Sequence, residues 1–123
     1  MSYHVSLVYR FPEIGRQETA IVDHHNEGII VVEGGSDRAI ISVTYNYGHL
    51  YRLARIFPKG NGLRWLNGRT AKDVTDYLEL GAIRLGTRRY KDIYAPTPGN
   101  AGHVLSVLLK WARQHPEATF EVH

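Results

Sequence analysis

The sequence has no cysteine among its 123 residues. It therefore cannot form a disulfide framework, a thiolate nucleophile or a sulfur-ligated metal site. It also has no charged leader followed by an apolar run of signal-peptide length, and nowhere do about 18 apolar residues follow one another. We expect a soluble, cytoplasmic protein without a membrane-spanning segment.

Motifs of catalysis are missing as well. The chain has neither the G-x-S-x-G motif of serine hydrolases nor the G-x-x-x-x-G-K-[ST] motif that cradles nucleotide triphosphates. No two histidines have the i, i+4 spacing of a helical zinc site, and the adjacent His24 and His25 would lie on opposite faces of a strand. We predict no metal, no cofactor and no enzymatic activity, with an unrecognised enzyme as an open alternative.

The composition fits one globular domain that covers residues 1–123. Apolar residues make up 43% of the chain and charged residues 22%, which are ordinary values for a folded domain. The net charge is +3, and basic residues concentrate in the middle of the chain. These residues are Arg52, Arg55, Lys59, Arg64, Arg69, Arg84, Arg88, Arg89 and Lys91. Planar arginine forks suit phosphate groups, although solubility alone would also explain so small an excess.

One basic segment of this region contains two glycines. Lys59, Gly60, Asn61 and Gly62 could form a mobile loop that covers a phosphate. An ordinary surface turn is the alternative interpretation, because the segment lacks the sequence of a phosphate-binding loop.

The first part of the chain predicts four β-strands. The first strand alternates between apolar and polar side chains, and its apolar face extends to Phe11. The predicted strands cover residues 3–11, 18–24, 28–33 and 38–45, with the clearest hairpin turn at 34–37. Short turns favour antiparallel pairing, so we expect a meander or a close variant of one.

The second part predicts two helices. Residues 71–80 follow a variant of the capping box formed by Thr70 and Asp73. The last helix opens between Thr97 and Asn100, and its wide apolar stripe predicts that it lies across a sheet. A helical turn is expected within residues 49–57 and a short closing strand at 118–122. The expected fold is α+β, a mostly antiparallel sheet with two helices packed on one face.

Two segments combine aromatic rings with amides, one at residues 45–47 and one at 90–100. Tyrosine rings can stack on a base while asparagine pairs with a base edge, and the N–H groups of a helix start can hold an anion. Both segments would line one cleft if the end of the fourth strand lies beside the start of the last helix. The candidate ligand-binding residues are Tyr45, Asn46, Tyr47, Arg88, Arg89, Tyr90, Lys91, Gly99, Asn100 and His103. Alternatively, the tyrosines are rim residues and Asn100 is a helix cap.

Three segments carry a family resemblance: TYNYG, LRWLNGRTAKDV and YAPTPGNAGHVLSVLLKWARQHPEATFEVH. Over roughly residues 43–123 the chain resembles the Thoeris anti-defence family, phage and prophage proteins that sequester cyclised ADP-ribose signals and, in some members, cyclic oligonucleotides. The resemblance implies a homo-oligomeric sponge that binds its nucleotide without cleaving it. The positions matching the two family motifs are Tyr45, Asn46, Tyr47, Gly99 and Asn100.

The function expected is therefore sequestration of a cyclic nucleotide signal by a phage-type protein. One alternative is a protein-interaction module that inhibits a host defence complex through its basic surface. Another is a basic nucleic-acid-binding protein, whose affinity would fall steeply with salt. The small charge excess and the lack of a recognised motif speak against the second alternative.

Overall fold

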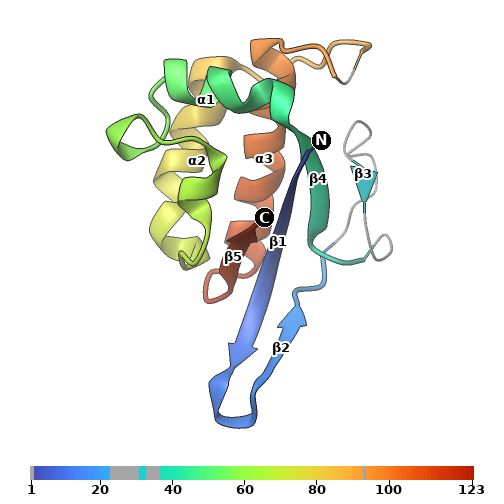
Figure 1. Ribbon diagram of the computed structural model, residues 1–123, viewed down its shortest axis with the longest axis vertical. Coiled ribbons are helices and arrows are strands. Elements are labelled where there is room, and N and C mark those ends of the chain that lie inside the picture. The colour runs from blue at the N-terminus through green and yellow to red at the C-terminus, as the bar shows by residue number, and fades with distance from the viewer. Residues whose placement is uncertain (1, 23–30, 33–36, 93) are drawn as a thin grey trace.

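The computed structural model describes residues 2–22, 31–32, 37–92 and 94–123. The fold is α+β, with helices packed on an antiparallel sheet, as the sequence predicts (Figure 1). The strands are β1 (Ser2–Phe11), β2 (Arg16–Thr19), β3 (Val31–Val32), β4 (Ile40–Thr44) and β5 (Thr119–Val122). The α-helices are α1 (Gly48–Leu53), α2 (Ala71–Leu85) and α3 (Pro98–Gln114). None of the helices in these ranges is long and apolar enough to cross a membrane.

The sheet is built on β1, which pairs with three other strands. Its first half pairs antiparallel with β4 and its second half with β2. β5 follows α3 and pairs with the opposite edge of β1, where Val5 aligns with Val122. The predicted closing strand at residues 118–122 is thereby confirmed.

The strand order is β2-β1-β4-β3, which corrects the predicted meander. The change of partner occurs at Leu7, whose carbonyl accepts from the N–H of Ala20 and whose N–H donates to the carbonyl of Ala39. One long strand thus pairs with two others in succession, and strands adjacent in sequence need not be neighbours. Of the predicted strand at 28–33, only β3 lies within the described residues, and most of the predicted turn at 34–37 lies outside them.

The hairpin of β1 and β2 projects beyond the helices (Figure 1). At its tip Phe11 is 39% exposed and Ile14 is 69% exposed. The alternation of β1 predicted a buried Phe11, and this prediction is wrong because no helix covers that end of the strand.

The helix α2 is longer than the sequence predicts, since it continues past residue 80 to Leu85. Gly81 does not end it. A Cβ at Gly81 would lie 2.5 Å from Leu105 Cδ1 and 2.7 Å from Ile56 Cγ2, so glycine at this position allows close packing of α2 against α3. The predicted capping box does not form, because the side chain of Thr70 makes no capping hydrogen bond.

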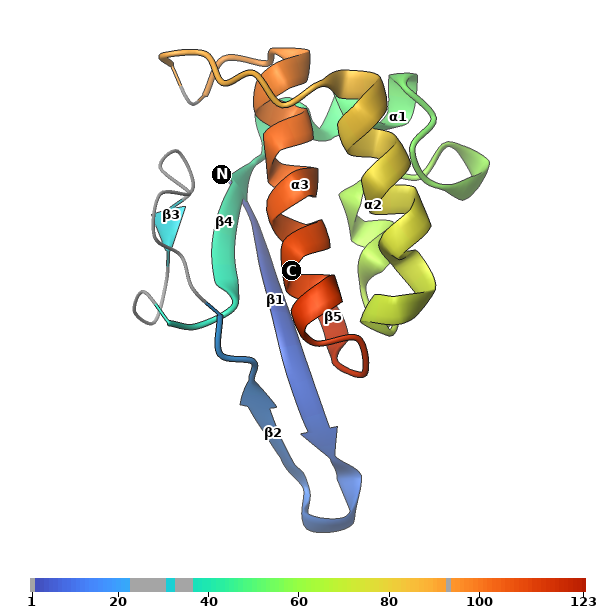
Figure 2. The same ribbon diagram turned by 180° about the vertical axis from the view of Figure 1, so that it is seen from behind.

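α3 lies across the sheet with α2 beside it (Figure 2), and this arrangement builds the core. Trp111, Leu105 and Leu108 of α3 are fully buried, as are Leu7 of β1 and Phe120 of β5. Each such side chain stabilises the fold by about 1.5–3 kcal/mol relative to an exposed one. The wide apolar stripe predicted for this helix is confirmed.

Candidate functional site

The candidate site forms where the end of β4 meets the loop of residues 86–97. Thr44 Oγ1 accepts a hydrogen bond from the N–H of Asn46 at 3.2 Å, so β4 stops at Thr44 and the chain turns into a 3-10 helix at Tyr45–Tyr47. The strand predicted at 38–45 therefore ends one residue earlier, and it begins two residues later, at Ile40. Asn46 Nδ2 then donates to the carbonyl of Tyr94 at 2.8 Å. This bond joins the two segments that would line one cleft if the end of the fourth strand lies beside the start of the last helix.

The loop is also held by Asn100, which is fully buried in the first turns of α3. Its Oδ1 accepts from the N–H of Tyr90 at 2.7 Å, and its Nδ2 donates to the carbonyls of Asp92 and Ala95 at 3.0 and 3.1 Å. Both amide hydrogens are thus used within the protein. The prediction that Asn100 contacts a ligand is corrected, since its side chain positions the loop.

The true cap of α3 is Thr97, whose Oγ1 accepts from the N–H of Asn100 at 3.2 Å. Of the two caps that the sequence allowed, the structure has the first. The alternative interpretation of Asn100 as a cap is therefore wrong as well.

Two glycines bring the start of α3 against the beginning of the loop. A Cβ at Gly99 would lie 1.8 Å from the carbonyl oxygen of Arg88, and one at Gly102 would lie 1.8 Å from that of Gly86. No other residue fits at either position without moving the backbone. We therefore attribute the glycine at 99 to packing, which replaces its predicted contact with a ligand.

The two tyrosines of residues 45–47 have different environments. Tyr47 is 3% exposed, so its ring cannot stack on a ligand as predicted. Burial raises the pKa of its phenol above the usual value, and the nearby Asp92 carboxylate and Tyr94 phenol raise it further. Tyr45 is half-buried and packs edge-on against Tyr3, with ring centroids 4.5 Å apart.

Arg64 contacts both rings of this tyrosine pair. Its Nη2 donates to the hydroxyl of Tyr45 at 3.3 Å, and its guanidinium carbon lies 5.0 Å from the ring centre of Tyr3 and 5.7 Å from that of Tyr45. Tyr45 is thus part of a cation–π cluster. Arg64 belongs to the basic residues of the middle of the chain, but this contact was not predicted, because it joins elements distant in sequence.

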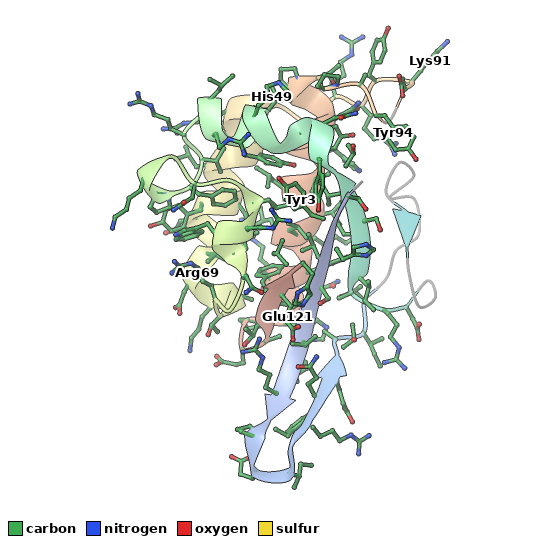
Figure 3. The ribbon with its side chains drawn as sticks, in the orientation of Figure 1. Tyr3, His49, Arg69, Lys91, Tyr94 and Glu121 are labelled. Carbon is green, nitrogen blue, oxygen red and sulfur yellow. The ribbon has the colours of Figure 1, made fainter. Side chains whose placement is uncertain are left out.

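The exposed part of the site is the outer surface of the loop. Tyr90 is 59% and Tyr94 58% exposed. Arg88, Arg89 and Lys91 are exposed as well. Figure 3 shows Lys91 and Tyr94 projecting from the loop at one end of the molecule, away from Arg69. Aromatic faces for stacking and cations for phosphate pairing are therefore presented together.

Comparisons with known protein families, with curated proteins and with solved structures gave no match.

His103 lies three residues after Asn100 on α3 and is half-buried. Its carbonyl accepts from Ser106 Oγ at 2.6 Å. The structure places it one turn from the residue that holds the loop, so it borders the site without belonging to the loop. Among the residues that the structure describes, no three histidine or acidic side chains lie close enough to hold a metal ion.

Tyr94 is not among the predicted ligand-binding residues, although it lies within the predicted 90–100 segment. It is as exposed as Tyr90, and its backbone is fixed by Asn46 and by Asp92, whose Oδ1 accepts from the N–H of Tyr94 at 2.9 Å. The sequence does indicate Tyr94 as a candidate, because it is an aromatic residue between a basic segment and Pro96.

Proposed function

We propose that the protein binds a small phosphorylated nucleotide on the outer surface of the 86–97 loop and retains it uncleaved. The ligand class is a cyclic nucleotide signal, of the cyclic ADP-ribose type or a cyclic oligonucleotide, and the biological role is that of a phage anti-defence sponge. The family resemblance supplies the class and the role. The observation that supports this site is the structure of the loop. Asn46 and Asn100 hold its backbone, and Tyr90 and Tyr94 are exposed on it beside three cations.

Fixing the loop before the ligand arrives favours tight binding. Asn100 supplies three hydrogen bonds to the backbone of the loop and Asn46 a fourth. A preordered loop loses less conformational entropy on binding, which leaves more of the interaction energy for affinity. A protein that sequesters a scarce signal needs this property.

The roles within the loop follow from exposure and charge. The rings of Tyr90 and Tyr94 stack on the bases of the ligand, and Arg88, Arg89 and Lys91 pair with its phosphates. The position of Tyr45 beside Arg64 places a second aromatic and cationic group on the neighbouring segment. The resemblance also implies that the protein acts as a homo-oligomer.

The oligomer would use the projecting hairpin of β1 and β2. Phe11 and Ile14 expose apolar surface at its tip, and exposed apolar groups of this kind favour burial against another copy of the chain. Sedimentation of the purified protein measures the number of subunits directly.

The test is isothermal titration of the full chain with cyclic ADP-ribose isomers and with cyclic di- and trinucleotides, followed by chromatography of the released ligand. Saturable binding of one compound with intact ligand recovered supports the proposal. No binding across the panel contradicts it and directs the search to a host protein target.

The affinities of single variants test whether the nucleotide binds at the loop. Tyr90→Ala and Tyr94→Ala each remove a largely exposed ring, so we expect unchanged stability and about 5- to 100-fold weaker binding, as for loss of one stacked base. The matched control is Ile83→Ala, which removes a 71% exposed apolar side chain from α2 and leaves the loop intact. Equal affinities for all three variants and the wild type would place the ligand elsewhere.

A further inference from the structure

A second basic region lies on the other side of α1 from the loop. It is a depression of about 520 Å³ lined by Arg52, Arg55, Phe57, Pro58, Lys59 and Gly60. Its volume falls within the range of small-molecule sites. Figures 1 and 2 show the far part of the 86–97 loop, where Figure 3 labels Lys91 and Tyr94, on the opposite side of the molecule from the segment that follows α1.

The depression carries positive charge without compensation. Arg52, Arg55 and Lys59 are exposed, and no acidic residue lines the depression. Within the described ranges, no carboxylate forms an ion pair with any of these three side chains. Three like charges around one hollow repel one another, and an anion bound between them relieves that repulsion.

Arg55 stands at a position where the backbone favours glycine. The N–H of Arg55 donates to the carbonyl of Arg52, and the N–H of Ile56 donates to that of Tyr51, which is the hydrogen-bond pattern of a Schellman helix end. The residue after the cap of such an end adopts a left-handed conformation, and Arg55 has φ of 51°. Arginine at this position costs conformational energy that glycine would not.

Lys59 repeats this feature four residues later. Its φ is 59°, and it and Arg55 are the two non-glycine residues with positive φ among those the structure describes. Both are basic and both line the same depression. Unfavourable backbone conformations concentrate at functional sites, where the surrounding structure imposes them.

The carbonyl groups at the end of α1 would otherwise oppose an anion here. Arg84 Nη1 donates to the carbonyls of Ala54 and Arg55, each at 3.2 Å. This contact from α2 satisfies the helix end and adds a fourth cation next to the depression. The buried Phe57, stacked on Trp65 with ring centroids 5.5 Å apart, anchors the segment between Arg55 and Lys59.

We infer that this depression binds the phosphate or diphosphate group of a small molecule, independently of the nucleotide site on the loop. Arg55 and Lys59 contribute charge-assisted hydrogen bonds, and Arg52 adds charge at the rim. Both residues line the depression, and both have a left-handed backbone conformation.

The test is calorimetric titration of the full chain with inorganic pyrophosphate at low salt. Arg55→Gly and Lys59→Asn remove one charge each and place a residue that tolerates positive φ, so both variants keep or raise the melting temperature. We expect each to weaken pyrophosphate binding about tenfold or more. The control Arg113→Gln removes an equal charge from α3, where Arg113 pairs with Glu79, and leaves binding unchanged.

Three results would overturn the inference. These are no saturable binding of pyrophosphate at millimolar concentration, equal weakening by the two variants and the control, and tight binding of a single-stranded oligonucleotide with which pyrophosphate does not compete. The double variant Arg88→Gln and Lys91→Gln separates this site from the loop, because it removes two exposed cations assigned to phosphate pairing there and leaves the depression unchanged. If pyrophosphate still binds to that variant, the depression is a separate site. If binding is lost, the inference of a separate site is wrong.

Discussion

The side-chain oxygen of Asn100 accepts the backbone N–H of Tyr90 at 2.7 Å. One atom of a fully buried side chain thus fixes the segment that carries the exposed tyrosines of the candidate site. Because the same amide also donates to the carbonyls of Asp92 and Ala95, a single residue of α3 holds three points of the loop.

Replacing Asn100 by alanine leaves these three backbone groups without their partners. We expect Asn100→Ala to lower the free energy of unfolding by about 2–4 kcal/mol. Hydrogen exchange of the Tyr90 amide should accelerate by a larger factor than exchange of the core amides of β1, because the loop opens locally before the protein unfolds. Ligand binding at the loop should weaken through this loss of order.

Thr97→Ala is the control for this variant. It removes only the capping bond to the N–H of Asn100, so we expect a loss of about 0.5–2 kcal/mol with the Tyr90 amide still protected. Unchanged protection of the Tyr90 amide in Asn100→Ala would show that the loop does not depend on this residue.

The contact between α3 and the start of the loop predicts a severe effect of a single methyl group. In Gly102→Ala the new Cβ would meet the carbonyl oxygen of Gly86 at 1.8 Å, so α3 and residues 86–88 must separate. Overpacking of this kind costs about 1–3 kcal/mol, and more where backbone has to move. Urea denaturation measures the loss.

Gly62→Ala provides the comparison, because it adds the same methyl group where only the flexible Arg52 side chain lies near, at 3.5 Å, and where φ is −95°. Its stability should stay within about 0.5 kcal/mol of the wild type. Equal losses for the two glycine variants would mean that the contact with the carbonyl of Gly86 does not set the cost.

Periodicity predicted those elements whose environment is uniform along their length. The stripe of α3 and the alternation of the first half of β1 were read correctly, because each faces the core throughout. The same alternation failed at Phe11, since the strand continues past the edge of the helical layer. The alternation of a strand contains no information on where the helices that cover the strand end.

The glycines also show that a local sequence pattern does not identify tertiary neighbours. The predicted helix ended at residue 80, whereas Gly81 lies inside α2, where Leu105 and Ile56 approach it. Gly99 was interpreted as a ligand contact, and the carbonyl of Arg88 approaches it instead. A glycine in the sequence indicates that another group can pack close to its Cα atom. Only the tertiary structure identifies that group.

The candidate site was predictable in part. The sequence allowed residues 45–47 to meet the loop on the condition that the end of the fourth strand lies beside the start of the last helix, and the bond from Asn46 to Tyr94 shows that the two segments meet. The burial of Tyr47 and Asn100 could not be foreseen, because polar aromatic and amide residues are found both inside and at the surface. The left-handed conformations of Arg55 and Lys59 oppose their own propensity, so no local rule predicts the depression that they line.

The buried phenol of Tyr51 predicts how stability responds to high pH. Tyr51 is 0% exposed and donates to the carbonyl of Ala101 at 3.0 Å. Burial raises its pKa well above the ordinary value of 10.0, and the neighbouring Tyr47 and Tyr3 raise it further. The folded state therefore keeps a proton that the unfolded state releases near pH 10. Its stabilising contribution is complete below that pH and is lost as the pH rises above it.

Tyr51→Phe tests this linkage through melting temperatures measured from pH 7 to pH 11. The variant should lose about 0.5–1.5 kcal/mol at pH 7, because the hydrogen bond to Ala101 is gone. Above pH 10 its melting temperature should fall less steeply than that of the wild type, since the variant has no phenol at this position to ionise on unfolding. Tyr90→Phe, altered at a 59% exposed ring, should follow the wild-type curve. Parallel curves for Tyr51→Phe and the wild type above pH 10 would show that ionisation of Tyr51 is not coupled to unfolding.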